Sequence, residues 1–305
     1  MLKYILKDIN DVETIFEHPL SMSIVSSEDA PADSFRAVFA VGGKIPELYS
    51  VRVLDGGDIV FFGFVDEQTE TVADKGILLE ISARGPESVL LDNEAMPQTY
   101  CMPTMKILFE RHFKPLGFKG VVGGERAFPG DLVISKGMSE WQVLSNYCEK
   151  FCKSKPVVRS DLVIETGENS QPDTIYLGEN SSIIKISRTI SRNAPVSDVY
   201  VRTYFAGGYE MYIGNETAKK HRIQRKRYFN CADSKYRSVL YADNIIKNSN
   251  GKYERYTIDL SGILGCKVGD TLMVRNRRGK MKIDELHYVL DGSGEHTRIY
   301  AEVIV

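Results

Sequence analysis

The part of this sequence that most clearly could bind a ligand is a short run of basic side chains, which would attract anionic groups. Clustered cations bind nucleic acid because they displace the counterions held by its phosphates. Against that hypothesis, no aromatic side chain that could stack on bases follows until Tyr228 and Phe229, and the net charge of the chain is −2. A solvated or subunit-facing surface is the favoured interpretation. Six lysines and arginines occur within nine residues: Lys219, Lys220, Arg222, Arg225, Lys226 and Arg227.

Five cysteines offer possible metal ligands, but their spacing does not favour a metal site. Cys148 and Cys152 lie four residues apart on a predicted helix, which would place both thiols on one face. Neither a histidine nor a third cysteine lies nearby to complete a zinc site. Because the count is odd and no CxxC pair occurs, we expect thiols buried in the protein. No metal and no cofactor are predicted.

The common catalytic motifs are missing from the sequence. It contains no GxSxG, HExxH or P-loop pattern. His112 lies on the apolar stripe of a predicted helix and His287 in an alternating strand, so we expect both to be hydrogen-bonded packing residues. The glycine-rich segment 120–124 lacks the glycine spacing of a phosphate loop and is interpreted as a turn. No catalytic residue is predicted, and the chain is not expected to be an enzyme.

The elements that would position such side chains are organised around residues 49–84. Tyr49, Val51 and Val53 alternate with polar residues, which is the period of a half-buried strand. Gly56-Gly57 can adopt the positive φ angles of a hairpin turn. Residues 59–65 are apolar on both faces, and alternation resumes after a polar gap and a turn at 74–76. This pattern predicts a three-stranded meander whose middle strand is covered twice, by its own core and by a closed barrel or a partner subunit.

The flanking segments predict further strands and helices. Strands are expected in the first 48 residues at 22–25 and 35–41, followed by a short helix at 87–91 after Pro86. Between residues 93 and 165, Thr104 and Ser139 can each cap a helix. Strands then return from 174 onward, with an inserted helix from Asp233, and a second Gly-Asp pair at 269–270 repeats the pair at 57–58.

Composition and length are those of an ordinary soluble globular protein, with 43% hydrophobic and 26% charged residues among 305. The length favours about two domains. No apolar run approaches the roughly 18 residues of a membrane span. The first ten residues lack the apolar region of a signal peptide, so we expect synthesis in a cytoplasm.

Four segments, taken in order, give the sequence a family resemblance. Residues 58–66 (DIVFFGFVD) have the pattern of a strand with F-x-G-x-V after a Gly-Asp turn, and residues 138–148 are similar to a central helix. Residues 184–192 are similar to a crossover into a second half, and residues 286–290 to a closing hairpin strand. In this order and spacing the chain resembles the baseplate-hub proteins of contractile phage tails and tail-like bacteriocins, of the phage Mu hub and late-control D type.

The resemblance implies a mixed, β-rich α+β fold with two related, tail-tube-like β-barrel domains at 1–92 and 166–305. A small α+β module at 93–165 lies between them, and the second barrel contains the inserted helix. It implies a homotrimer whose ring of six barrels adapts a hexameric tail tube to a trimeric central spike, within a virion or tail-like particle. Its partners would be the tube protein, the spike protein and other baseplate proteins, with a LysM-type protein as one candidate. DNA would be only passing cargo, and no membrane is involved.

Two surfaces are assigned on this basis. The basic run would be a charged partner or lumen face, although it and the divergent first 48 residues depart from the family pattern. Two alternative functions remain open, a cell-wall hydrolase component of the tail and a nucleic-acid-binding module built on residues 219–227. The candidate subunit interface is the middle strand of the meander, through Ile59, Phe61, Phe62 and Phe64.

Overall fold

The computed structural model of the chain describes all residues except 1, 75, 128–129, 153, 168–171, 180, 203–207, 231–237, 276, 278 and 305. At residues 73, 150, 151, 230 and 238–244 only the backbone is described. The chain divides into two compact units. One unit comprises Met1–Pro172 with His287–Glu295, and the other comprises Asp173–Leu286 with His296–Val305. No helix in the described part of the chain is long and apolar enough to cross a membrane.

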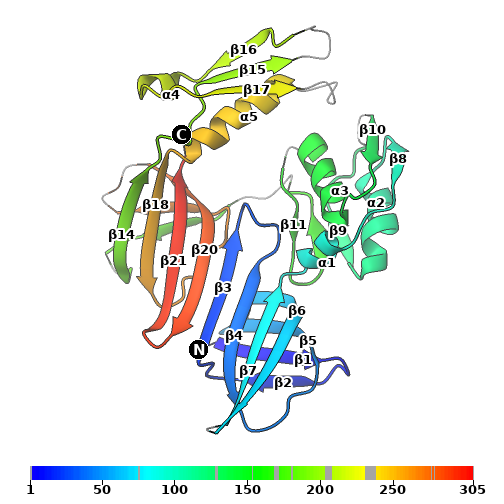
Figure 1. Cartoon of the computed structure of the whole chain (residues 1–305), viewed down its shortest axis with the longest axis vertical. Coiled ribbons are helices and arrows are strands. Elements are labelled where there is room, and N and C mark those ends of the chain that lie inside the picture. Colours follow the sequence, from blue (N-terminus) through cyan, green and yellow to red (C-terminus); the bar gives the residue numbers. More distant parts are fainter. Residues whose placement is uncertain are drawn as a thin grey trace. The chain divides into compact units, whose positions relative to one another are not determined.

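The first unit is built on an antiparallel sheet with the strand order β3-β4-β7-β6-β5-β1-β2 (Figure 1). The predicted meander is present, and Gly56 and Gly57 have the positive φ angles of its first turn. The polar gap is not a loop, however, because β6 continues through it. The strands are β1 (Leu2–Asp8), β2 (Glu13–Phe16), β3 (Ser21–Ser27), β4 (Ser34–Val41), β5 (Leu48–Asp55), β6 (Asp58–Ala73) and β7 (Gly76–Arg84).

Aromatic rings fill the concave side of this sheet. Tyr4 on β1 contacts Phe39 on β4, with 5.5 Å between ring centroids, although these strands are not neighbours in the hydrogen-bonded order. Phe16 on β2 also contacts Phe39, at 5.1 Å. Contacts between strands so far apart in the order require the sheet to roll up around its core. The rolled sheet explains how residues on one face of β1, β3, β4, β5 and β7 become buried.

A small α+β module within the first unit follows the sheet. Thr104 accepts a hydrogen bond from the backbone N–H of Ile107, and Ser139 forms a reciprocal capping box with Gln142, so both predicted caps are confirmed. The glycine-rich segment is only partly a turn, because residues 120–122 pair with β12 as a parallel strand. Its elements are α1 (Glu87–Asp92), β8 (Gln98–Cys101), α2 (Met105–Leu108), the π-helical turn η1 (Phe109–Phe113), the 3-10 turn η2 (Lys114–Leu116), β9 (Gly120–Val122), β10 (Asp131–Ile134), α3 (Glu140–Tyr147), the π-helical turn η3 (Cys148–Cys152), β11 (Val157–Val158) and β12 (Val163–Glu165).

The strands of the second unit pair in the order β14-β18-β21-β20. Strand β19 pairs with β20 and, in parallel, with β13. Alternating side chains of β18 and β21, such as Ile258 and Ile299, are fully buried, as the sequence predicts for half-buried strands. These strands are β13 (Thr174–Leu177), β14 (Ile183–Ile190), β18 (Glu254–Ser261), β19 (Thr271–Val274), β20 (Met281–Asp291) and β21 (Gly294–Val303).

The two Gly-Asp pairs begin different local structures. Gly57-Asp58 belongs to the two-residue hairpin between β5 and β6. Asp270 instead accepts hydrogen bonds from the backbone N–H groups of Lys267 and Asp173, at 2.8 and 3.2 Å, and leads into β19. The repeated pair is therefore a likeness of sequence and not of turn geometry.

A smaller sheet, β16-β15-β17, completes the second unit. Helix α5 packs on one face of it, where Ile245 and Ile246 contact a cluster centred on Val199 and Val201 (Figure 1). The predicted helix is present from residue 238, and its predicted start at Asp233 and residue Tyr236 lie outside the described residues. The elements are β15 (Asp198–Arg202), β16 (Met211–Gly214), α4 (Glu216–Lys220), β17 (Lys226–Asn230) and α5 (Ser238–Gly251).

Candidate functional site

The middle strand of the meander turns its phenylalanines to opposite sides. Phe61 is only 3% exposed and stacks on Phe35 with 5.3 Å between ring centroids. Phe62 and Phe64 lie on the other face, half-buried, with their rings edge to face at 5.6 Å. The prediction that one of Phe61 and Phe62 points into the core and the other outward is confirmed, because successive strand residues face opposite ways.

A third aromatic side chain joins the outward pair. Tyr49 on β5 lies 5.3 Å from Phe64, centroid to centroid, and is half exposed. We call Tyr49, Phe62 and Phe64 the outer aromatic row. The predicted interface strand contributes only two of its residues to this row, since Phe61 lies in the core. Ile59 is 46% exposed at the hairpin end, beyond a register shift between Val53 and Leu54.

The sequence analysis placed Tyr49 on the wrong face. Strict alternation puts it beside Val51 and Val53, which are fully buried, yet Tyr49 is exposed and Ser50 is buried. The alternation changes phase here because β5 has one extra residue: Lys7 of β1 pairs with Ser50 and Asp8 pairs with Leu48, which leaves Tyr49 between them. A bulge of this kind reassigns the face of each residue beyond it, and no local motif marks its position.

Gly63 is needed at the centre of this strand. A Cβ atom at this position would lie 2.3 Å from the backbone oxygen of Arg84 on β7, and 2.7 Å from the ring of Phe61. The close approach lets the two strands stay paired next to the register shift between Val65 and Glu67. The Arg84 side chain then reaches back to Asp66 at 2.8 Å and on to Asp92 in α1 at 2.6 Å.

Two acidic side chains lie where α1 meets the sheet and the module. Burial raises the pKa of Glu87 to about 8, and the nearby carboxylate of Asp33 adds to the shift. Burial also raises the pKa of Asp33. The backbone N–H of Val158 on β11 donates a hydrogen bond to Glu87, which lowers its pKa less than burial raises it. Glu87 on α1 therefore contacts β11 through this hydrogen bond, and its burial favours the protonated form of the carboxyl group.

The basic run does not form one continuous surface. Lys219 and Lys220 end α4, Arg222 has a left-handed backbone with φ of 55°, and Lys226 and Arg227 begin β17. Between them Ile223 is buried. Helix, turn and strand send these side chains in different directions, so a single phosphate-binding stripe is not present.

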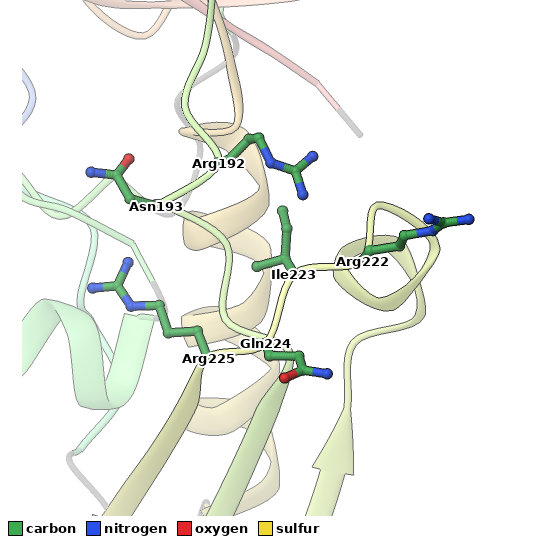
Figure 2. Close-up of a pocket in the computed structure, with 6 residues that line it drawn as sticks. All are labelled: Arg192, Asn193, Arg222, Ile223, Gln224 and Arg225. Carbon is green, nitrogen blue, oxygen red and sulfur yellow. The ribbon is translucent and has the colours of Figure 1, made fainter.

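A pocket of about 380 Å³ lies beside this turn. Figure 2 shows the side chains of Arg192 and Arg225 on opposite sides of Ile223, while Arg222 points away from both. Arg192 donates a hydrogen bond to the backbone oxygen of His221, and Arg225 donates one to that of Ala194. The three guanidinium groups do not converge on one point, so the pocket is a basic depression. Its lining is Arg192, Asn193, Arg222, Ile223, Gln224 and Arg225.

His112 forms a polar network inside the module. The hydroxyl of Tyr100 lies 2.9 Å from its Nε2 atom, and a carboxylate oxygen of Glu140 lies 2.9 Å from its Nδ1 atom. All three residues are buried. The network joins β8, the π-helical turn η1 and the start of α3, which satisfies the polar groups within an apolar core. The predicted packing role of His112 is confirmed, whereas His287 is half-buried in β20.

The two spaced cysteines take part in the same core. Cys148 is fully buried and Cys152 packs against the cluster around it. In the part of the chain that the structure describes, no group of three or more histidine, cysteine or acidic residues could hold a metal ion. The expectation of buried thiols is wrong for Cys101, which is exposed on the short strand β8, and Cys231 lies outside the described residues.

Comparison with known proteins gives similarity of structure alone. No protein-family model and no curated protein sequence matches the chain. The chain superposes on a tail protein from Neisseria meningitidis with a TM-score of 0.77 and 17% identity, over 99% of this chain and 96% of that one. A prophage MuSo2 tail protein from Shewanella oneidensis gives a TM-score of 0.76 and 15% identity, over 98% of each chain.

A more distant similarity extends beyond phages. An Escherichia coli component of the type VI secretion system gives a TM-score of 0.60 and 8% identity, over 100% of this chain and 77% of that one. That protein is itself described as similar to the bacteriophage T4 tail proteins gp27 and gp5. At these identities the comparisons show the fold. The chain therefore has the fold of phage tail proteins and of a type VI secretion component, along essentially its whole length.

Proposed function

We propose that this protein is a structural component of a contractile tail, the hub of its baseplate. The observation that carries the proposal is the superposition on two tail proteins along nearly the full length of all three chains. A fold shared over single domains recurs among unrelated functions. A match across both units and the module supports a common role more strongly than a match of one sheet.

In this proposal three copies form a ring. Two related barrels at 1–92 and 166–305, with the module at 93–165 between them, would give the ring six barrels. Such a ring adapts a hexameric tail tube to a trimeric central spike. Other baseplate proteins bind around it, with a LysM-type protein as one candidate. The particle is a phage or a tail-like bacteriocin, and DNA is only cargo in the former.

The outer aromatic row supports the subunit contact. Two half-buried phenylalanine rings and a half-exposed tyrosine form a contiguous apolar patch on β5 and β6. Patches of this kind on a soluble protein mark interaction sites. We assign Phe62 and Phe64, with Tyr49, to the contact with a neighbouring subunit, while Phe61 supports them from within.

The role is structural rather than catalytic in this proposal. The one histidine–carboxylate network described above is buried in the module, where it satisfies packing. The basic run is divided between a helix, a turn and a strand. Neither the hydrolase nor the nucleic-acid hypothesis receives support from these arrangements.

Native mass spectrometry of the protein, alone and produced together with the tube and spike proteins of its own particle, tests the proposal. We expect a trimer, at the latest in the presence of these partners. Phe62→Asp should weaken the trimer while the chain stays folded. The matched control is Val133→Asp, at an apolar position that is 56% exposed on β10 of the module. A monomer under both conditions would refute the hub hypothesis.

A further inference from the structure

The sheet β16-β15-β17 carries a row of tyrosines on the face opposite to α5. Tyr200 on β15 is the register partner of Tyr212 on β16 and of Tyr228 on β17. The alternate residues of the same strands, Val199 and Val201 among them, form the cluster against α5. The three tyrosines therefore share the outer face, and we call them the tyrosine row.

Two of the three tyrosine side chains in the row are exposed to solvent. Tyr228 is 63% exposed and Tyr212 is 47% exposed. Tyr209 extends the row, with its ring edge to face against Tyr228 at 5.4 Å. Tyrosine is enriched at protein interfaces because it combines apolar area with a polar hydroxyl. A contiguous exposed cluster of such rings points to a binding surface.

The orientation of the rings decides which kind of ligand fits. Tyr200 and Tyr228 stack on each other with an interplanar angle of 20°, and Tyr212 leans on the other side of Tyr200 at 46°. Lys219 covers the ring of Tyr212, with Nζ 5.5 Å from its centroid. Tyr200, Tyr212 and Tyr228 thus each have one ring face engaged within the protein. A nucleobase needs an open ring face to stack on, so this arrangement favours contacts through ring edges and hydroxyl groups.

Basic side chains surround the row. On the strands themselves, Lys226 lies two residues before Tyr228 and Arg202 two residues after Tyr200, which places both on the tyrosine face, and both are exposed. Asp198 lies on the same face, but its carboxylate accepts hydrogen bonds from Tyr212 at 2.8 Å and Ser197 at 2.6 Å. The carboxylate of Asp198 is therefore already engaged, and that of Glu216 pairs with Lys219 at 3.2 Å.

The basic character continues beyond the end of the row. A depression of about 570 Å³ is lined by Lys219 and Lys226, together with Asp198. It shares Ile223 and Gln224 with the arginine-lined pocket of Figure 2. The tyrosine row thus borders the depression of Lys219 and Lys226, and the arginine-lined pocket adjoins that depression. We call the row and the two depressions together the strip.

We propose that this strip is the docking site for an acidic, extended segment of a partner protein. Its carboxylates would accept hydrogen bonds from the lysines and arginines of the depressions, and its backbone would lie across the tyrosine hydroxyls and ring edges. Charge complementarity selects an acidic occupant, and the engaged ring faces select protein over nucleic acid. The site is separate from the outer aromatic row and does not depend on the hub assembly.

Fluorescence anisotropy with three probes tests this assignment on the full chain. The probes are a dodecapeptide of alternating glutamate and serine, its glutamine counterpart, and a dodecamer of deoxythymidylate. We expect the glutamate peptide to bind at least about tenfold more tightly than the glutamine peptide, as charge-assisted hydrogen bonds require. Tyr228→Ala and Lys226→Ala should each weaken that binding at least about fivefold.

Matched variants separate the strip from general charge and aromaticity. Tyr176→Ala removes a tyrosine that is also 63% exposed, on β13, and Lys247→Ala removes an exposed lysine on α5. Both should bind the glutamate peptide like the wild type, and all four variants should keep the wild-type unfolding midpoint. The assignment is overturned if the glutamate peptide does not bind, if deoxythymidylate binds more tightly, or if the control variants weaken binding as much as Tyr228→Ala.

Discussion

The outer aromatic row of the first unit and the tyrosine row of the second are built on the same principle and differ in what they present. Each consists of side chains from adjacent strands on the face opposite to a core. Phe62 and Phe64 offer only hydrocarbon, and they are half-buried by each other and by Tyr49. Tyr212 and Tyr228 are more exposed and carry hydroxyl groups, so water can solvate them.

The difference separates two kinds of surface. A phenylalanine patch gains free energy from any apolar cover, at about 25 cal/mol for each Å² removed from water, which suits a permanent subunit contact. A tyrosine row bordered by Lys219 and Lys226 loses hydration when it is covered unless the partner supplies acceptors. The second surface therefore discriminates among partners, whereas any apolar partner surface that buries the first stabilises it.

The comparison would fail if the phenylalanines of β6 were interchangeable. Phe61→Asp should lower the free energy of unfolding by more than about 4 kcal/mol, because it deletes a core ring and buries an unpaired charge. Phe62→Asp should lower it by less than about 1 kcal/mol. Urea unfolding of the two variants side by side measures both values. Equal losses would show that the two faces of β6 are packed alike.

Glu87 offers a way to weaken the first unit, away from the phenylalanine row, with pH alone. Its pKa is raised from 4.5 to about 8 by burial, so in that window the folded chain holds a proton that the unfolded chain has lost. Stability should therefore fall as the pH rises through the window. Glu87→Gln should remove this slope and be more stable at about pH 9 by at least about 1 kcal/mol, the value of one pKa unit.

Unfolding midpoints of both proteins across the pH range provide the measurement. Below the ordinary glutamate pKa the two proteins should converge, since both then carry a neutral side chain. Identical slopes for the wild type and the variant would mean that Glu87 is solvated in the folded state. The peptide-binding affinity of the tyrosine row serves as the internal control and should not respond to the substitution.

The helix caps of the module sharpen the comparison because they support neither row. Ser139→Ala removes one half of a capping box and should lower the free energy of unfolding by about 1 kcal/mol. Thr104→Ala should have a smaller effect, since its hydrogen bond to Ile107 is long at 3.4 Å. Denaturant titration gives the stabilities. A loss of trimer or of peptide binding in either variant would show that the two surfaces depend on the module.

The smallest effect is expected within the tyrosine row itself. Tyr212→Phe removes a hydrogen bond to Asp198 and should change the free energy of unfolding by no more than about 0.5 kcal/mol. The pKa of Asp198 is held below its ordinary value by Ser197 first and by Tyr212 second. It should therefore rise in the variant while remaining lowered. A carboxyl NMR titration of Asp198 follows the shift, with Tyr176→Phe as control. An unchanged pKa of Asp198 would show that the Tyr212 hydroxyl does not donate a hydrogen bond to it.

Much of the fold could be predicted from local patterns. The meander at 49–84, the strands near 22–25 and 35–41, and the caps at Thr104 and Ser139 follow from interactions between residues close in the chain. Periodicity, positive φ at Gly56 and Gly57, and hydrogen bonds three residues apart act at short range. The orientation rule that separates Phe61 from Phe62 is equally local, although it does not say which of them faces the core.

The candidate surfaces depended on contacts that no local pattern contains. Tyr49 joins Phe64 only because one extra residue of β5, opposite Lys7 and Asp8 of β1, changes the phase of β5. Tyr200, Tyr212 and Tyr228 come from three strands, and one of the two pairings that align them is parallel. The basic run is continuous in sequence but is divided by the end of α4 and the burial of Ile223.

What the sequence by itself determined was therefore which segments become strands and helices and how each alternates. Only the tertiary structure decided which faces are buried and which side chains from distant segments meet. The physical reason is that side-chain periodicity is a property of one strand, whereas register and burial are properties of its pairing with others. A single bulge or a parallel pairing changes the neighbours of a residue without changing any residue near it in the chain.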